Sequence, residues 1–564
     1  MPRGMAGPGD LVRPSAGPSL VPGSGGMLRH ASSLGSRRES PPRSRSAGVV
    51  HSWPVTEVRL AELVAALSLG VDLGFGQPME HVLRECMIAL RLADRIGLEE
   101  AERSTVYYTA LLVNVGCHAD AHEQAKWFGD DIALKSTKYD RDFRTLRAAA
   151  ATMSLVGSGN PPLHRFRVGL EFAISGHRDL DGMVERHSAI ARGLAERLGL
   201  AETVQEAVGA SYEQWDGKGW PGGLEGDRIP VAARLAQFAE FIEVAHRLGG
   251  IDAAVALAER RAGSQFDPAL SAALRADAED ILGGLDSANT WGAVIDAEPA
   301  LRVNLSGDSF DRALLAIADF VDLKSPYTLG HARAVAELAT ATASRLGLPE
   351  DEARVLRRAG LVHDLGRLGV SNAIWDKPGP LGAGEWERVR LHPYLTERML
   401  RQSEALAPLA AIAVQHRERL DGSGYPKGLS GGAITRHARI LGVVDAYQSM
   451  LEPRPYRPQF TADAAADQLQ AEIRAGKLDG EAVAAVLAAA GHSVGRRQDW
   501  PAGLTTREID VLRLVARGLS SKQIATELVI TPKTARNHIE HVYTKIDASS
   551  RVAASLFATE HGLL

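Results

Sequence analysis

Helical periodicity is the most regular feature of the chain. In the segment 330–347, apolar positions recur at steps that place them on one face of a helix, namely Val335, Leu338 and Leu346. His331 stands one turn before Val335 on this face, so its imidazole is expected to point inward. Patterns of this kind predict an all-α fold, made of two helical bundles and a smaller C-terminal domain of four helices.

The next predicted helix carries polar groups on its buried face. Leu356, Gly360, His363 and Arg367 follow steps of three to four residues, so the last two share a face with core positions. Asp364 projects about 100° from His363 on a helix, and both side chains can reach one metal ion. An inward His-Asp pair beside an inward arginine requires compensation, which a divalent metal and a bound phosphate would provide.

The chain contains a long internal repeat. At an offset of 250 residues, three features recur: His81, Gly97-Leu98 and Gly116 match His331, Gly347-Leu348 and Gly366. At an offset of 205, residues 187–235 match residues 392–440, so the first copy carries about 45 extra residues between Gly116 and His187. The sequence therefore predicts two versions of one domain rather than a short-period solenoid.

The first copy lacks most of the residues that could bind a metal. The positions of His363, Asp364, His416 and Asp445 hold Val113, Asn114, Ser211 and Glu240, and Gly219-Trp220-Pro221 stands in place of Gly424-Tyr425-Pro426. Valine cannot bind a metal, and asparagine and serine are poor substitutes for anionic or imidazole ligands. The first copy is expected to serve as a scaffold, dimer surface or sensor, with His81 and His187 in structural roles.

These patterns divide the chain into six segments. The N-terminal segment is rich in Arg, Ser, Pro and Gly and is expected to be disordered; whether its first 26 residues are translated stays open. The predicted segments are a basic tail (1–55), a degenerate domain (56–285), a linker (286–306), a largely intact domain (307–492), a second linker (493–502) and a terminal domain (503–564).

Composition limits the setting of the protein. The 564 residues carry a net charge of −5, so any contact with nucleic acid must come from a local patch. Cys86 and Cys117 are the only cysteines, which argues against a disulfide framework and favours a reducing cytoplasm. No run of 18 apolar residues occurs, so no membrane partner is expected.

Further imidazole and carboxylate positions follow the His-Asp pair. His392 stands at a predicted helix start, His416 lies near the end of an apolar helix, and Asp445 follows an apolar run. The glycine-rich segment 421–426 lies between the last histidine and the last acid and ends in Gly-Tyr-Pro. In this order, the residues resemble the HD-GYP family over about residues 310–466.

The resemblance to the HD-GYP family implies a metal-dependent phosphodiesterase. It implies one or two divalent transition metals per chain, iron or manganese, the first held by His331, His363, Asp364 and Asp445 and the second by Asp364, His392 and His416. The catalytic groups would be His363, Asp364 and Arg367, the last binding the substrate phosphate. Gly424, Tyr425 and Pro426 would contact a guanine nucleotide, which in this family means cyclic di-GMP.

Departures from the family pattern leave the activity open. The second histidine of the family's His-His-Glu motif is replaced by Arg417, a permanent cation that cannot coordinate a metal. Tyr327 stands where trinuclear members carry an acid, and Arg367 replaces a lysine, whose proton it cannot donate. The alternatives are a nucleotide sensor, an assembly scaffold for a transcription factor, or a hydrolase of another phosphodiester.

The segment 503–564 predicts short helices with clear caps. Thr505 with Glu508 and Ser520 with Gln523 have the spacing of capping boxes, and Thr531 precedes a proline at the first helical position. The pattern predicts a helix-turn-helix whose third helix can enter a major groove.

This segment resembles the LuxR-type DNA-binding domain over nearly its full length. The resemblance implies that Lys522 and Lys545 contact phosphates, whereas the groups that approach bases are Lys533, Thr534, Arg536 and Asn537. It also implies that a fourth helix, 551–562, pairs two subunits into a homodimer that reads half-sites about 34 Å apart. The expected protein is a cytoplasmic DNA-binding regulator with a cyclic dinucleotide as ligand or substrate.

Overall fold

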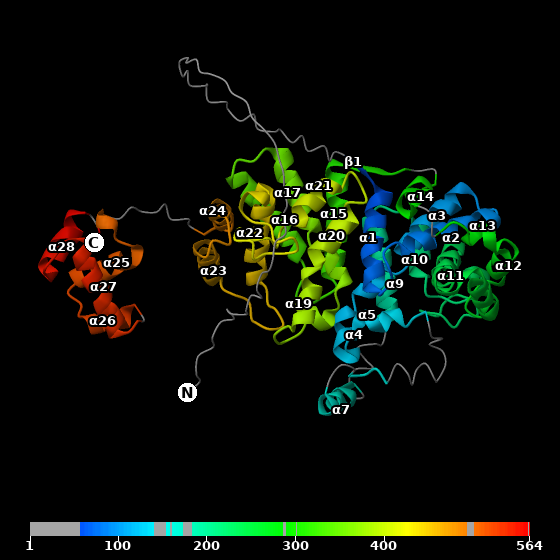
Figure 1. Ribbon diagram of the computed structural model, residues 1–564, viewed down its shortest axis with the longest axis horizontal. Helices are drawn as coiled ribbons and strands as arrows, with labels where there is room; N and C mark the ends of the chain where they lie inside the picture. The colour runs from blue at the N-terminus through cyan, green and yellow to red at the C-terminus, as the bar shows by residue number, and fades with distance from the viewer. Residues whose placement is uncertain are drawn as a thin grey trace, which may run out of the picture. The chain divides into compact units, whose positions relative to one another are not determined.

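The computed structural model of the chain describes residues 57–139, 154–157, 161–172, 183–285, 289–299, 302–492, 501–528, 530–561 and 563. Its regular structure is helical apart from one antiparallel pair of strands, β1 (Glu57–Arg59) and β2 (Asn304–Ser306) (Figure 1). The all-α prediction is confirmed. The predicted basic tail, 1–55, lies outside the described residues. Within the described ranges, every helix is too short or too polar to cross a lipid bilayer.

The first half of the chain is a bundle of helices that runs up to β2. Its longest helix, α11, contains a break at Gly250, where φ is +73° and only glycine is unstrained. The helices of this half are α1 (Leu60–Gly74), α2 (His81–Arg95), α3 (Glu100–Leu112), η1 (Val115–His118), α4 (Ala121–Phe128), α5 (Asp131–Ser136), α7 (Pro162–Glu171), α9 (Met183–Arg197), α10 (Glu202–Gly209), η3 (Gly226–Arg228), α11 (Val231–Arg261), α12 (Pro268–Ala276), α13 (Ala278–Leu282) and α14 (Thr290–Asp296).

The second half begins with β2 and holds most of the predicted site. Its helices are α15 (Gly307–Asp322), α16 (His331–Arg345), α17 (Glu350–Val362), η4 (Leu365–Gly369), α18 (Asn372–Trp375), α19 (Ala383–Arg390), α20 (His392–Leu400), α21 (Ala407–Ala413), η5 (Gly431–Ala433), α22 (Arg436–Leu451), α23 (Ala462–Arg474) and α24 (Gly480–Ala489). The predicted inward face of α16 is correct, because His331 and Val335 are both buried.

The two halves share one hydrophobic core. Helix α1 lies beside α20 (Figure 1) and also packs against η4, both in the second half. The contact is close at Gly70, where an added Cβ would lie only 2.8 Å from the side chain of Leu368. Burial of apolar surface stabilises the folded state by about 25 cal/mol per Å². The first half therefore supports the short helix η4, which carries Arg367.

The segment 286–306, predicted as an irregular linker, contains regular structure. Residues 290–296 form α14, in which Trp291 and Val294 are buried, and residues 304–306 form β2. Residues 286–288, 300 and 301 lie outside the described residues. The helix has only seven residues, which is too short for its periodicity to stand out in the sequence.

Several contacts recur at the two offsets of the predicted repeat. Asp72 accepts a hydrogen bond from the backbone N–H of Val82 (3.1 Å), and Asp322 accepts one from Ala332 (2.9 Å). An added Cβ at Gly116 would lie 2.1 Å from the carbonyl oxygen of His187, and one at Gly366 would lie 1.9 Å from that of His392. These glycines allow the same close backbone approach in both halves.

The C-terminal domain has its own hydrophobic core. It contains η6 (Pro501–Gly503), α25 (Thr506–Ala516), α26 (Ser521–Glu527), α27 (Pro532–Lys545) and α28 (Arg551–Glu560). The predicted capping boxes are present, with Thr505 accepting a hydrogen bond from the N–H of Glu508 and Ser520 from that of Gln523. Residues 493–500 of the second predicted linker and residues 562 and 564 lie outside the described residues.

Candidate metal centre and nucleic-acid interface

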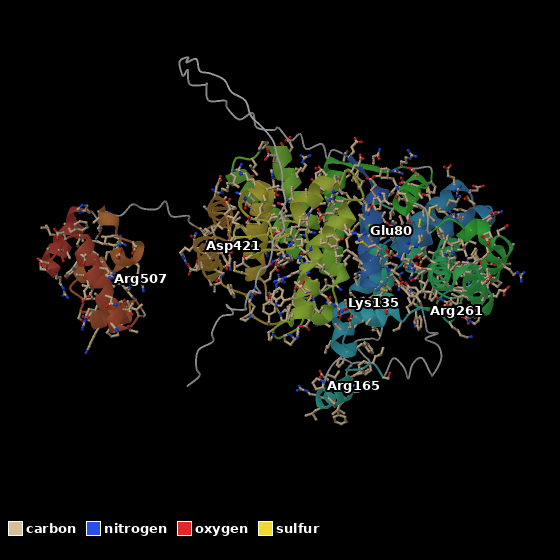
Figure 2. All side chains as sticks on the ribbon, in the orientation of Figure 1. Glu80, Lys135, Arg165, Arg261, Asp421 and Arg507 are labelled. Carbon is tan, nitrogen blue, oxygen red and sulfur yellow. The ribbon has the colours of Figure 1, made fainter. Side chains whose placement is uncertain are left out.

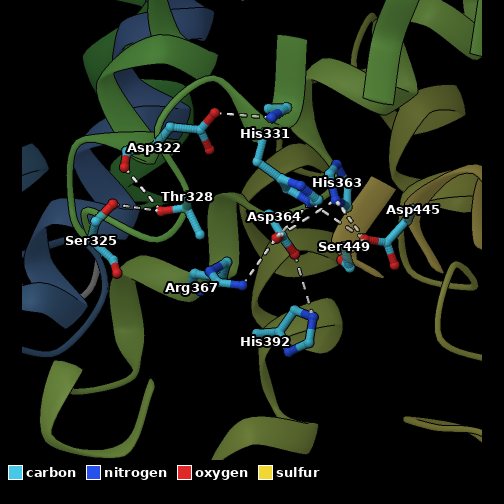
Figure 3. Close-up of polar contacts among 12 residues, drawn as sticks. Asp322, Ser325, Thr328, His331, His363, Asp364, Arg367, His392, Asp445 and Ser449 are labelled. Carbon is cyan, nitrogen blue, oxygen red and sulfur yellow. Dashed lines mark hydrogen bonds and ion pairs between the residues drawn. The ribbon is translucent and has the colours of Figure 1, made fainter. Parts of the chain in front are cut away.

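The six residues predicted to bind metal converge in the second half. Most of these residues lie at or just beyond a helix terminus, where side chains from different helices can meet. His331 begins α16, His363 and Asp364 follow α17, His392 begins α20, His416 follows α21, and Asp445 lies within α22. All six are buried, and Figure 3 labels His331, His363, His392 and Asp445 around Asp364.

The first group of donors surrounds one side of Asp364. His331, His363 and Asp364 offer ligand atoms that all lie within 4.8 Å of one another. Oδ1 of Asp445 lies 3.3 Å from Nε2 of His331 and 3.8 Å from Nε2 of His363. Two carboxylates and two imidazoles therefore face one point.

The second group lies on the other side of the same carboxylate. Asp364, His392 and His416 also offer ligand atoms within 4.8 Å of one another. Oδ1 of Asp364 lies 3.5 Å from Nε2 of His392 and 3.8 Å from Nε2 of His416, and the two nitrogens are 3.4 Å apart. Asp364 thus belongs to both groups and would serve as a ligand of a metal held by either group.

Backbone carbonyls fix the orientation of three imidazoles. Nδ1 of His363, His392 and His416 each lies 2.6–2.7 Å from the carbonyl oxygen three residues earlier. A proton on Nδ1 that is donated to a carbonyl leaves the lone pair of Nε2 free toward the centre. The Nδ1 of His331 contacts a carboxylate instead of a carbonyl, since it lies 3.0 Å from Oε1 of Glu452.

The donor set fits a divalent metal. Nε2 of His331 and of His363 and Oδ1 of Asp364 are buried and lack a hydrogen-bond partner among the described residues. An unsatisfied buried polar atom costs about 1–3 kcal/mol. Coordination would satisfy all three, and nitrogen with carboxylate oxygen is a donor set that suits iron, manganese and similar ions.

The electrostatics of the centre favour the ligand forms of most of its members. Burial alone would raise the pKa of Asp364, but His363 and Arg367 hold it well below its usual range. Burial lowers the pKa of His392 to about 3 and also lowers that of His416. Burial opposes protonation of His331 too, but Asp445 and Glu452 raise its pKa to about 9, so it must release a proton on ligating a metal.

Arg417, the departure from the family pattern, lies against the first group. Its guanidinium is 3.2 Å from Oδ2 of Asp445, and burial is outweighed by this carboxylate, which raises the pKa of Arg417. The guanidinium also donates to Oδ1 of Asp445 (3.4 Å), the oxygen that lies 3.3 Å from Nε2 of His331. Arg417 therefore shares the carboxylate of Asp445 with the first donor group.

A cavity of about 570 Å³ adjoins the centre at His392. Its walls combine positive charge with aromatic rings: Arg367, Arg417, Arg454 and Arg457 with Trp375, Trp386, Tyr425 and Tyr456. The guanidinium of Arg367 lies 3.9 Å above the ring of Trp375 and 3.3 Å from Oδ2 of Asp364. Such walls suit an anionic ligand with flat rings, such as a nucleotide.

Of the three predicted Gly-Tyr-Pro contacts, Tyr425 lines this cavity, whereas Gly424 and Pro426 are not among its lining residues. Gly424 instead allows close packing, since an added Cβ would lie 2.4 Å from the backbone N of Arg419. Glu418 anchors the loop by accepting from the N–H groups of Lys427 (2.7 Å) and Leu429 (2.8 Å). Asp421, labelled in Figure 2, is exposed and accepts from Ser423.

Sequence reasoning missed several residues of the site. Glu452 orients His331, and Trp375 stacks on Arg367. Arg454 and Tyr456 lie in an irregular segment after α22 whose spacing gives no signal, although its repeated arginines and prolines mark it as unusual. Only the fold brings this segment over the cavity.

In the first half, the ammonium group of Lys138 lies between two residues that correspond to predicted metal-binding residues of the second half. Nζ of Lys138 lies 2.7 Å from Oε1 and 2.9 Å from Oε2 of Glu240, and 3.1 Å from Oδ1 of Asn114. By the repeat offsets, Glu240 and Asn114 stand at the positions of Asp445 and Asp364. His81 contacts Glu243 through Nδ1. The described residues of this half contain no group of three or more potential metal ligands whose ligand atoms all lie within 4.8 Å of one another.

All six predicted DNA contacts are exposed in the C-terminal domain: Lys522, Lys533, Thr534, Arg536, Asn537 and Lys545. Ala535 and Val542, on the other face of α27, are buried. The Nζ of Lys545 lies 2.7 Å from Oε2 of Glu508 and 3.1 Å from the carbonyl oxygen of Gly503, and its contact with a phosphate stays a prediction. Tertiary folding places Glu508 beside it, and the sequence gives no sign of this.

Family models match both parts of the chain. The model described as an HD domain matches residues 178–270 and 316–482, and the model of bacterial regulatory proteins of the luxR family matches residues 502–558. The two HD segments fall in the two halves.

One relative and one solved structure resemble the chain over most of its length, and another relative resembles a part of it. The 3′3′-cGAMP-specific phosphodiesterase 3 of Vibrio cholerae is 31% identical over 72% of this chain and 89% of its own length. The cyclic di-GMP phosphodiesterase response regulator RpfG of Xanthomonas campestris is 35% identical over 28% of this chain and 43% of its own. A crystal structure of a cyclic GMP-AMP specific phosphodiesterase from V. cholerae matches with a TM-score of 0.54 and 27% identity, covering 77% of this chain and 98% of that one.

Proposed function

Because the chain belongs to the HD-GYP family of HD-domain proteins and ends in a luxR-family domain, we propose that its second half hydrolyses a guanine-containing 3′,3′-cyclic dinucleotide. The chain is a regulator that carries an HD-GYP domain and a DNA-binding domain. The observation that supports hydrolysis is the meeting of six buried donors with a cavity walled by arginines and aromatic rings.

The metal-binding residues would be the two donor groups that share Asp364. His331, His363 and Asp445 complete the first group, and His392 and His416 complete the second. A metal bound there supplies Lewis-acid chemistry and lowers the pKa of a coordinated water. The carbonyl contacts of Nδ1 keep the imidazoles in their ligand orientation, so little reorganisation is needed on binding. Iron or manganese is the proposed metal.

Arg367 would bind the scissile phosphate. Its guanidinium lies 3.9 Å from the centre of the Trp375 ring, contacts Asp364 and lines the cavity. A planar fork in this position neutralises phosphoryl oxygens and orients them toward the centre. Tyr425 and Trp386 would stack on the bases, and Arg454 and Arg457 would neutralise the second phosphate.

The substrate is either cyclic di-GMP or 3′,3′-cGAMP. The relative that is matched over 89% of its own length is named for cGAMP, whereas the relative RpfG is named for cyclic di-GMP. Both ligands carry two phosphates and at least one guanine, and the cavity walls suit both. Purified protein, loaded with iron or manganese, should be assayed on each and on a linear dinucleotide, with metal content measured in parallel.

The pairing of Arg417 with Asp445 favours one alternative, a nucleotide sensor. Saturable binding of a cyclic dinucleotide without cleavage, by protein that carries metal, would support the sensor. The absence of both nucleotide binding and cleavage would support a scaffold. Cleavage of either cyclic dinucleotide supports the proposed hydrolase.

Arg367→Ala is expected to lower kcat/KM for the cyclic dinucleotide about 100-fold, or roughly 2.7 kcal/mol, because a charge contact to the phosphate is lost. Arg367→Lys should retain part of the activity, because the charge remains while the fork is lost. Steady-state kinetics checks both. Unchanged metal content is the control, and an Arg367→Ala enzyme with wild-type kcat/KM would contradict the proposed role.

For the DNA-binding domain, Arg536→Ala is expected to weaken binding to a specific operator by about 1–3 kcal/mol while affecting random DNA less. Lys522→Ala should weaken both kinds of DNA alike and reduce the salt dependence by about one charge. Fluorescence anisotropy at several salt concentrations measures this. Equal losses for both variants on both DNAs would contradict the assignment of Arg536 to bases.

We further propose a homodimer on DNA, paired through α28 as in the LuxR-type resemblance. Analytical ultracentrifugation with and without operator DNA tests this assembly.

A further inference from the structure

A cysteine, a histidine and an acid form a buried chain of contacts in the first half. Sγ of Cys117, in η1, lies 3.4 Å from Nδ1 of His187, in α9. Nε2 of His187 lies 2.6 Å from Oδ2 of Asp120. The hydroxyl of Tyr212 lies 2.8 Å from the same sulfur. The proposed phosphodiesterase site uses none of these groups.

The surroundings stabilise a thiolate paired with an imidazolium. Burial by itself would raise the pKa of the Cys117 thiol, but His187 lowers it below its usual value, with smaller contributions from Lys138 and Tyr212. Burial would lower the pKa of His187, but Cys117 and Asp120 raise it to about 9. Hence the proton is expected on the imidazole.

Neighbouring groups hold this arrangement in place. Arg186 lies 3.3 Å from the carboxylate of Asp120, which in turn contacts the far nitrogen of His187. Burial, the Cys117 sulfur and Glu240 raise the pKa of Tyr212, so its hydroxyl stays protonated and donates to the sulfur. A nucleophile, a base and an acid that orients the base are the elements of activated cysteine sites.

We propose that Cys117 is a nucleophilic thiolate that small hydroperoxides oxidise to a sulfenic acid. The side chain is 8% exposed, which admits only small reagents. The sulfur attacks one peroxide oxygen, so an S–O bond forms, the O–O bond breaks, and sulfur loses two electrons. With hydrogen peroxide, the leaving hydroxide takes the proton of His187 and departs as water.

Cys86 provides an internal control. It is 0% exposed, its sulfur lies 3.7 Å from the carbonyl oxygen of Tyr107, and burial raises its pKa well above the usual value. Both cysteines are free. The two thiols therefore differ in environment while they share one chain and one sample.

The test uses the full-length protein, treated with hydrogen peroxide and then with dimedone, which labels sulfenic acids. Peptide mass spectrometry should show label on Cys117 and none on Cys86. His187→Gln should slow labelling of Cys117 by at least about tenfold, because the thiolate fraction falls and the proton donor is lost. Equal labelling of both cysteines, or no effect of His187→Gln in folded protein, would overturn the proposal.

A second measurement on the unaltered protein decides the matter if His187→Gln does not fold. The rate of alkylation of Cys117 by iodoacetamide should fall much less steeply than that of an ordinary thiol as the pH is lowered from about 8 to 6. A rate that falls about tenfold per pH unit below about 8.5, as for an ordinary thiol, would overturn the proposal. The result is independent of phosphodiesterase activity.

Discussion

Asp364→Ala is expected to abolish hydrolysis of cyclic dinucleotides, with turnover reduced by about 1000-fold or more, or roughly 4 kcal/mol. Among the described residues, Asp364 is the one member common to both donor groups. Its loss removes a carboxylate from each and leaves four imidazoles with less charge compensation. Metal content measured by mass spectrometry should fall together with turnover.

The matched control for this change is Asp467→Ala, which removes an exposed acid of α23 in the same half. It should keep full metal content and activity. If Asp364→Ala retained both metals and turnover, the two donor groups would not be the metal site. If it lost metal but kept its binding of cyclic dinucleotide, the cavity would be shown to bind ligand without the metal.

Lys138→Met is expected to destabilise the protein by about 3 kcal/mol, because it leaves the buried carboxylate of Glu240 without its cation. Glu240 is 1% exposed and accepts hydrogen bonds from Lys138, Asn114 and Tyr139. The measurement is the free energy of unfolding of the protein from denaturant titration. Lys218→Met, at a surface lysine, is the control and should change stability little.

A double change isolates the charge. Adding Glu240→Gln to Lys138→Met should recover part of the lost stability, because the residue left behind is then neutral. Burial raises the pKa of Glu240, but Lys138 and Asn114 outweigh it and hold the pKa below 4.5. The stability that this pair contributes is therefore present above about pH 4.5 and is lost as the pH falls through the lower folded value. A Lys138→Met protein as stable as the wild type would contradict the idea that the ammonium of Lys138 compensates the buried charge of Glu240, as a metal ion would at Asp445.

Much of the fold and of the metal centre could be predicted from the sequence. Helical spacing predicted that His331 and His363 point inward, and the N-cap residues predicted where α25, α26 and α27 begin. The offsets of the repeat gave the corresponding positions in the first half. These predictions succeed because periodicity, capping and residue order are local or linear properties that a chain carries before it folds.

Other features depended on contacts between distant segments. Lys545 pairs with Glu508, a contact between residues 37 positions apart, and α14 lies where an irregular linker was expected. Glu452, Trp375 and Arg454 join the site without any signal in their spacing.

By itself, the sequence determined the class of the protein, the order of its donors and which copy kept them. Only the tertiary structure decided that six donors share one centre around Asp364, that an arginine and aromatic cavity adjoins it, and that Lys138 and Cys117 acquired new partners in the first half. The reason is physical: residue type and spacing fix which groups a chain offers, whereas charge compensation and pKa depend on which of those groups the folded core brings within a few ångströms.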